Sequence, residues 1–157
     1  MTQRKDIVPP IEFSGEAQLI LYTRYGDPRV AGWDNKWLTN WHVQSLFPWF
    51  PVSDFMVHKH FRPLLENAFR QLEIKDLHKE ILSFDGCYQI RSMGINEAVL
   101  SVHSWGAGID LNGKNNPIGS QGLWSNPFID VMTQCDIFCG QNWNGRKDPK
   151  HFAMVNG

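Results

Sequence analysis

Apolar residues in the first half of the chain recur at near-helical spacing between residues 55 and 72. This pattern predicts a helix that begins at the Ser53-Asp54 pair, because both residue types are common helix caps. Pro63 lies inside the pattern. We expect it to kink the helix or to restart it, since proline lacks the amide hydrogen that a helix interior uses.

The segment before this helix is rich in aromatic residues. Trp33, Trp37 and Trp41 are spaced by four, so we expect them to share one stripe of a helix. Residues 1–15 contain two adjacent prolines and are expected to be an irregular leader. We therefore take residues 1–52 as an irregular, aromatic-rich N-terminal part of the domain.

Short apolar runs separated by turn signals dominate the second half of the chain. They predict strands at residues 84–91, 98–102, 107–111 and 150–155. A late helix is expected to begin near Pro127, which the first helical turn tolerates well, and to end at Gly140. Helices followed by antiparallel strands predict an α+β fold, in which a small antiparallel sheet packs with helices.

Length and composition set limits on the class of protein. With 157 residues, the chain suits one domain with a real core, so we assign residues 1–157 to a single domain. A net charge of −1 gives no electrostatic footprint for nucleic acid. The polar N-terminus resembles no signal peptide, and no apolar run reaches the roughly 18–20 residues that cross a bilayer. We expect a monomer that is made in the cytoplasm and does not insert into membranes.

The three cysteines, Cys87, Cys135 and Cys139, do not suggest a disulfide framework, because they are few and odd in number. Cys135 and Cys139 lie four apart, which would place them on one face of a helix. A metal site is one interpretation of that spacing, but buried thiols on an apolar face are the commoner outcome. We expect all three cysteines to be reduced and buried.

The strongest chemical signal is a histidine and an aspartate seven positions apart, His103 and Asp110. Imidazole nitrogens and carboxylate oxygens are both good zinc ligands. The link between the two residues contains glycine, which lets the chain turn and present both side chains to one point.

A second stretch near the C-terminus completes the candidate site. His151 supplies another imidazole, and two histidines with one carboxylate leave the fourth position of a tetrahedral zinc ion open, as catalytic sites do. Asp148 lies three residues before His151, where it is placed to act as a base without binding the metal.

The stretch Ser101–Asp110 resembles the S-x-H-x-x-G-x-A-x-D motif of the zinc D-alanyl-D-alanine carboxypeptidase and L-alanyl-D-glutamate endopeptidase family, whose fold is shared with the Hedgehog signalling domain. Residues 148–152 are similar to the D-x-x-H-F ending of its phage endolysin branch, and the resemblance covers residues 84–155. It implies that the two histidines and Asp110 bind zinc. It also implies that Asp148 is the catalytic base.

Two further residues are judged against this family. Gly108 stands where the family usually has alanine, and because no ligand is lost we expect the difference to matter little. Arg91 lies in a short context similar to an arginine-containing segment of the family, and we expect it to bind a substrate carboxylate or the developing oxyanion. A surface ion pair is the alternative interpretation of Arg91.

Three residues close to the motifs are weaker candidates. Ser101 lies two positions before His103 on the expected strand, so both side chains should point to the same side. It would then orient a group near the metal, although a serine without a role is the open alternative. Trp105 and Trp143 flank the two motifs and are candidates for the walls of a groove.

The resemblance implies a zinc peptidase that hydrolyses the stem peptides of bacterial peptidoglycan by means of a metal-activated water. The D-x-x-H-F ending favours an endolysin-like L-alanyl-D-glutamate endopeptidase, which would act on the cell wall after release from the host cytoplasm. Two alternatives stay open: a D-alanyl-D-alanine carboxypeptidase or dipeptidase of the same family, and a non-catalytic zinc-binding domain of the same fold. Asp148 favours an enzyme, because a non-catalytic relative needs no base beside its third ligand.

Overall fold

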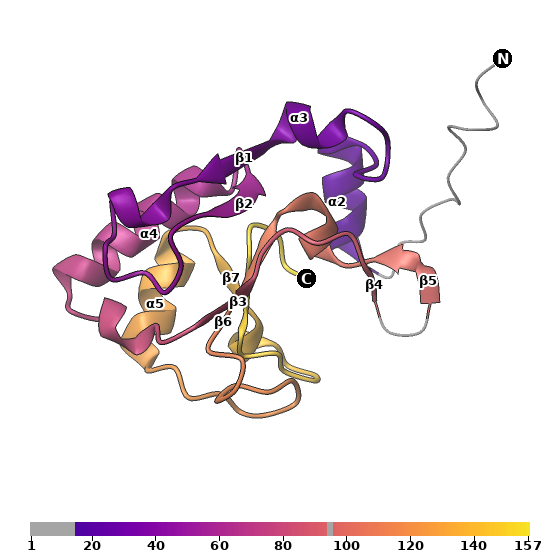
Figure 1. Cartoon of the computed structure of the whole chain (residues 1–157). Coiled ribbons are helices and arrows are strands. Elements are labelled where there is room, and N and C mark those ends of the chain that lie inside the picture. Colours follow the sequence, from indigo (N-terminus) through magenta and orange to yellow (C-terminus); the bar gives the residue numbers. More distant parts are fainter. Residues whose placement is uncertain (1–14, 94–95) are drawn as a thin grey trace, which may run out of the picture.

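The computed structural model describes residues 15–93 and 96–157, so the irregular leader expected for residues 1–15 lies almost wholly outside the described residues. The expected α+β class is confirmed: helices pack with small sheets, and the strand pairs of the described residues are antiparallel (Figure 1). No helix within these two ranges is long and apolar enough to traverse a bilayer.

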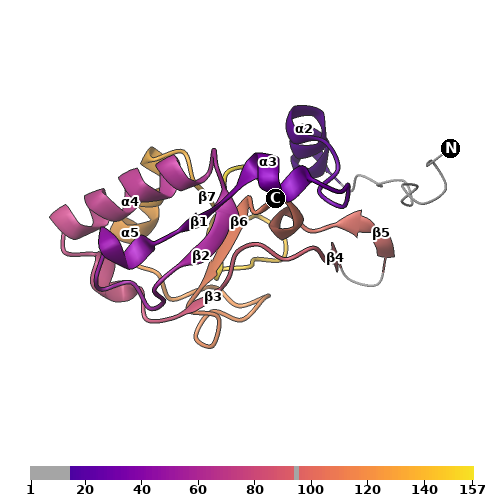
Figure 2. The ribbon, with the colours of Figure 1, turned by 45° about the horizontal axis from the view of Figure 1, so that its top comes forward.

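The helices gather at two ends of the molecule. The described α-helices are α2 (Glu16–Tyr25), α3 (Trp33–Trp37), α4 (Arg62–Ile74) and α5 (Asn126–Gln134). Short 3-10 turns are η1 (Val43–Ser45), η2 (His78–Glu80), η3 (Val102–Trp105) and η4 (Gly140–Asn142). Figures 1 and 2 show α4 beside α5 at one end, and α2 near α3 at the other.

The central sheet has the strand order β3-β6-β8-β7. Its strands are β3 (Phe84–Gly86), β6 (Gly108–Leu111), β7 (Phe138–Cys139) and β8 (His151–Ala153). Two separate pairs are β1 (Leu38–Trp41) with β2 (Phe55–His58), and β4 (Ser92–Met93) with β5 (Asn96–Leu100). β6 and β8 are inner strands that are buried at every position, so the sheet ties the middle of the chain to its C-terminal end.

Two clusters of buried side chains hold these elements together. The larger is aromatic and joins α4 and α5 to β2 and β6; Trp41 and Phe69 stack within it at 5.8 Å between ring centroids. Full burial of such a side chain is worth about 1.5–3 kcal/mol. The smaller joins α2 to η3 and to Val155. β8 contributes to both clusters, through Phe152 and Ala153 respectively.

The prediction that a helix begins at Ser53-Asp54 is wrong. The segment after this pair is β2, which pairs with β1 and buries Phe55 and Val57 in alternation. Over four residues, such alternation is hard to tell from helical spacing. Pro63 lies in the first turn of α4, where its missing amide hydrogen is not needed, so it begins the helix rather than bending it.

The expectation that Trp33, Trp37 and Trp41 share one helical stripe is also wrong. α3 is short and ends at Trp37, and the backbone of Leu38 is already extended. Trp41 lies at the end of β1, where it packs in the larger cluster. Pairing of β1 with β2 therefore overrides the four-residue spacing.

Cys87, Cys135 and Cys139 are free and buried, as expected. Cys135 and Cys139 do not share a helix face, because α5 ends before Cys135 and Cys139 lies in β7. The helix ends earlier than the predicted Gly140, since Asp136 adopts the left-handed conformation with φ of 64°. Burial raises the pKa of the Cys139 thiol to about 12, which keeps it neutral.

His58, at the end of β2, is a fully buried imidazole. Its ring packs against Tyr25 and Trp37, at centroid distances of 4.1 and 5.6 Å. Its Nδ1 accepts a hydrogen bond from the backbone N–H of His60 at 3.0 Å, and its Nε2 has no partner in the described part of the chain. Burial, with smaller effects of His60 and Lys59, lowers the pKa of His58 to about 4.

Stability should fall as the pH drops from 6.5 towards 4, because the unfolded chain then binds a proton at His58 that the folded chain excludes. His58→Asn removes this effect. Between pH 6.5 and pH 4 the unfolding free energy of the wild type should therefore fall by about 3 kcal/mol more than that of the variant. Urea unfolding at a series of pH values measures it. His42→Asn, which removes an exposed imidazole, is the control, and parallel profiles of wild type and His58→Asn would contradict the assignment.

Candidate metal centre

Asp110 and His151 face each other across two neighbouring strands of the central sheet. They are partners in the antiparallel register of β6 with β8, so their side chains leave the sheet on the same face. Opposite residues of this kind have Cβ atoms about 4.5–5.5 Å apart, which is close enough to share a ligand. The pairing brings together two residues that are 41 positions apart in the sequence.

His103 comes from η3 and not from the strand expected over residues 98–102. Ser101 caps this turn, because its Oγ accepts the backbone N–H of His103 at 3.3 Å. The expectation that Ser101 and His103 alternate onto one side of a strand is therefore wrong. Gly106 ends the turn with φ of 64°, and a Cβ there would lie 2.8 Å from Leu38 Cδ2, so both conformation and packing require glycine.

The structure brings the three predicted ligands together. The ligand atoms of His103, Asp110 and His151 lie within 4.8 Å of one another, and all three side chains are buried. His103 Nε2 and His151 Nδ1 are each 3.2 Å from Asp110 Oδ1. Burial alone would raise the pKa of Asp110, but its hydrogen bonds with the two histidines and their charges hold it well below its ordinary value. Asp110 is therefore a carboxylate at neutral pH.

The outward nitrogen of each histidine is bonded to a backbone carbonyl. His103 Nδ1 lies 2.7 Å from the Cys87 oxygen, and His151 Nε2 lies 2.7 Å from the Gly157 oxygen. A carbonyl only accepts, so these outer nitrogens donate, and the inner nitrogen of each ring faces the Asp110 carboxylate. An imidazole nitrogen that faces an anion needs a proton or a metal ion between the two. Two imidazoles and one carboxylate fit a zinc ion that keeps one open position.

Asp148 lies beside the three ligands without joining them in the metal-binding group of the described residues. It lines a cavity of about 140 Å³ together with His103, His151 and Trp143. Lys150 Nζ donates a hydrogen bond to Asp148 Oδ1 at 2.6 Å, which fixes the orientation of the carboxylate. This position agrees with a base that does not bind the metal.

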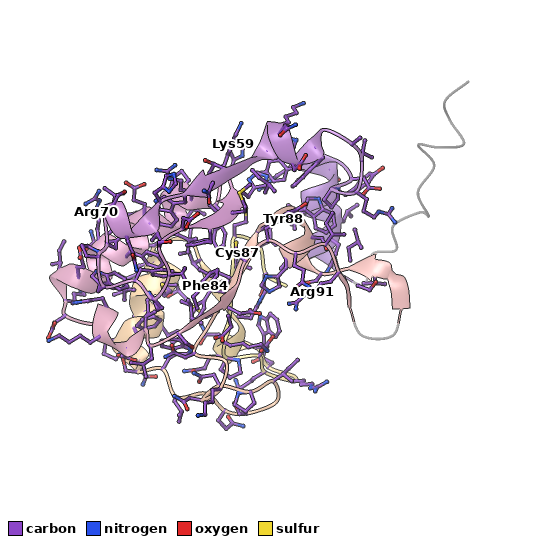
Figure 3. All side chains as sticks on the ribbon, in the orientation of Figure 1. Lys59, Arg70, Phe84, Cys87, Tyr88 and Arg91 are labelled. Atoms are coloured by element: carbon purple, nitrogen blue, oxygen red, sulfur yellow. The ribbon has the colours of Figure 1, made fainter. Side chains whose placement is uncertain are left out.

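Arg91 lies in the link between β3 and β4 (Figure 3). The strand expected over residues 84–91 is shorter than predicted, since β3 ends at Gly86. Its guanidinium is half exposed and lies 3.7 Å from Asp110 Oδ2. Its backbone N–H and carbonyl both bond to Ser104 Oγ at 3.0 Å. Arg91 borders this cavity, which is the larger of the two at the site (the main cavity), and a second one of about 50 Å³ along residues 85–89. It thus forms an ion pair, which was the alternative interpretation, and also borders the site, as substrate binding would require.

Trp143 and Trp105 differ from each other in their relation to the cavity. Trp143 lines it, as expected for a groove wall. The expectation that Trp105 forms a wall of the groove is wrong, because Trp105 is fully buried and its indole N–H donates to the Gly26 carbonyl at 2.9 Å. Trp105 instead anchors η3 to the end of α2.

Two residues of the site carry no motif signal in the sequence. Gln18 of α2 is buried, lines the main cavity and donates to the Leu100 carbonyl at 3.3 Å. Gly157 lines the same cavity and holds His151 through its carbonyl. The sequence signal for Gln18 is its position as a polar residue in an otherwise apolar run. Gly157 acts through its backbone carbonyl, which leaves no signal in the sequence.

Gly108 is more constrained than the sequence suggested. A Cβ at this position would lie 2.9 Å from His151 Cε1 and 3.0 Å from Val102 Cγ2. Both neighbours are held in place, one by its bond to the Gly157 carbonyl and the other by burial. Glycine at this position removes none of the three predicted ligands, and in this chain an alanine would press on the His151 ring.

Comparison with known proteins finds a family match within the second half of the chain. Residues 95–154 match the family described as D-alanyl-D-alanine carboxypeptidase, which confirms the resemblance seen in the motifs and suggests a peptidase that acts on peptidoglycan. The matched range contains the three buried residues that could hold the metal. It excludes α2 and the last three residues. No curated protein and no solved structure gives a significant match.

Gly108→Ala should weaken zinc binding about tenfold, because the added methyl group displaces the His151 ring from its bonded position. Competition with a chromogenic chelator measures the dissociation constant. Gly145→Ala is the matched control, since a Cβ at that glycine meets no atom within 4 Å. Equal zinc affinity of Gly108→Ala and the wild type would contradict this prediction. It would show that the chain makes room for the methyl group without displacing the His151 ring.

Proposed function

We propose that this protein is a zinc-dependent peptidoglycan peptidase of the endolysin-like type, which hydrolyses the L-alanyl-D-glutamate bond of cell-wall stem peptides. One observation carries the proposal: the buried ligand atoms of His103, Asp110 and His151 converge, and Asp148 lines the same cavity. The family match supports the class of substrate.

The residues divide the chemistry between them. A zinc ion held by the three ligands would lower the pKa of a water from about 15.7 to about 7 and polarise the scissile carbonyl. Asp148 takes the proton of the attacking water and passes it to the leaving amine. Lys150 keeps the Asp148 carboxylate in place for both transfers, through its 2.6 Å hydrogen bond.

Arg91 supplies a positive charge at the opening of the site. Its guanidinium is half exposed, so it can reach a substrate, and it lies on the Oδ2 side of Asp110, 3.7 Å away. A substrate carboxylate or the developing oxyanion binds there, because charge-assisted hydrogen bonds to a guanidinium are strong and directional.

The shape of the site favours an endopeptidase. The main cavity and the smaller one along residues 85–89 both reach His103 and Arg91. An endopeptidase must accept the peptide on both sides of the scissile bond, whereas a carboxypeptidase needs space for a single residue beyond it. Two cavities that meet at the ligands suit the first requirement.

Incubation of the zinc-loaded protein with purified peptidoglycan tests the proposal, with mass spectrometry to identify the new termini. A new N-terminus at D-glutamate supports the proposed bond. Release of D-alanine instead identifies the carboxypeptidase alternative. An intact substrate in the presence of bound zinc would identify the non-catalytic alternative and refute the proposed function.

Asp148→Asn and Asp110→Asn should separate the base from the ligand. Asp148→Asn should keep its zinc and lose at least about a hundredfold in activity, the usual share of general acid–base catalysis. Asp110→Asn should lose zinc affinity first, and activity as a consequence. Metal content and peptidoglycan hydrolysis are measured on the same preparations, with exposed Asp130→Asn as the control. Loss of zinc from Asp148→Asn alone would mean that the two roles are reversed.

Arg91→Ala should lower kcat/KM by roughly tenfold to a thousandfold, the scale of losing one charged stabiliser. Zinc content should be unchanged. Arg70→Ala removes an exposed arginine of α4 that lies away from Arg91 in Figure 3, and it controls for the loss of surface charge. A drop in zinc affinity with kinetics that recover at saturating zinc would instead assign Arg91 to the ion pair with Asp110.

A further inference from the structure

The last residues of the chain reach back to the candidate metal centre. Val155 is buried in the smaller cluster, and Gly157 N–H donates to the Val155 carbonyl at 3.0 Å, which turns the tail. The Gly157 carbonyl then accepts a hydrogen bond from His151 Nε2 at 2.7 Å. Figures 1 and 2 place the C-terminus in the body of the molecule, close to α2.

The tail is itself held by the N-terminal helix. Gly157 packs on Ala17 of α2 so closely that a Cβ on Gly157 would overlap the Ala17 Cβ. Ala17 is buried, and its Cβ is fixed to the helix backbone, so it cannot move aside as the end of a long side chain does. The position of the Gly157 carbonyl is therefore set by α2.

We propose that Val155–Gly157, clamped by Ala17, is a positioning element for His151. It fixes the imidazole with hydrogen on Nε2 and the lone pair of Nδ1 aimed at Asp110 Oδ1, 3.2 Å away. This inference rests on the metal site of the proposed function, and it adds a role for residues outside the matched segment 95–154.

The physical reason is the general one for histidines that bind metals. A bond from the outer nitrogen to an acceptor fixes the tautomer and the ring orientation and makes the inner nitrogen a better ligand. His103 obtains this bond from Cys87, which lies directly after β3 in the ordered middle of the chain. His151 obtains it from Gly157, whose position is held by the contact with Ala17 of α2.

Gly157→Ala tests the clamp, because the new methyl group collides with Ala17 and must push the carbonyl away from His151. Zinc affinity should fall about tenfold to a hundredfold, the range for loss of such a supporting bond. The absorption spectrum of the cobalt-substituted protein should change as well, since the orientation of His151 changes. A variant that lacks residues 156 and 157 should show the same loss.

Ala17→Gly combined with Gly157→Ala is the decisive variant. With the Ala17 Cβ removed, the nearest remaining atom of that residue is its Cα, at 3.8 Å from the new methyl group, which is an ordinary contact. Zinc affinity should return to within about threefold of the Ala17→Gly single variant, a non-additivity expected only of groups in contact. Asn156→Ala, which changes an exposed tail side chain, is the control and should bind zinc as the wild type does.

The outcomes separate this inference from the proposed function. Unchanged zinc affinity of both Gly157→Ala and the shortened chain, beside a wild type that binds zinc, overturns the clamp alone. A loss in Gly157→Ala that the double variant does not restore also overturns it, because the contact with Ala17 is then not the cause. A wild type that binds no zinc overturns the clamp and the metal site together.

Discussion

The pairing of β6 with β8 is the interaction on which the site depends. It places Asp110 opposite His151, and a slip of one residue would turn one of them to the other face of the sheet. The register is held by neighbours of the ligands, Ile109 and Phe152, which are fully buried in the larger cluster. Taking a carboxylate and two imidazoles out of water is costly, so the apolar clusters have to stabilise the arrangement that the chemistry needs.

The N-terminal helix belongs to the site as much as the motifs do. α2 lies outside the segment that matches the peptidase family, yet it contributes Gln18 to the cavity and Ala17 to the contact with the tail. Trp105 links the same helix to η3, through its bond to Gly26. The ligands therefore depend on packing from both ends of the chain, which a local motif does not encode.

Sequence patterns predicted the α+β class and a site that joins His103, Asp110 and His151, because residue chemistry and motif spacing are local properties. They failed where local spacing was ambiguous or where long-range pairing decided: Trp41 lies on a strand and Ser101 caps a turn. The constraint on Gly108 was invisible for the same reason, since it arises from the ring of a residue far along the chain. Backbone acceptors such as the Gly157 carbonyl leave no trace in residue identity at all.

The position of the Gly157 carbonyl has a consequence for engineering. A fusion module is ordinarily joined at either end of a folded domain. Here a linker that leaves from Gly157 would carry every movement of the added module to the ring of His151. A module joined ahead of Gly15 would pull on the first turn of α2, which holds Ala17 against Gly157 and Gln18 in the cavity. Either attachment therefore needs a flexible linker if the ring of His151 is to keep its orientation.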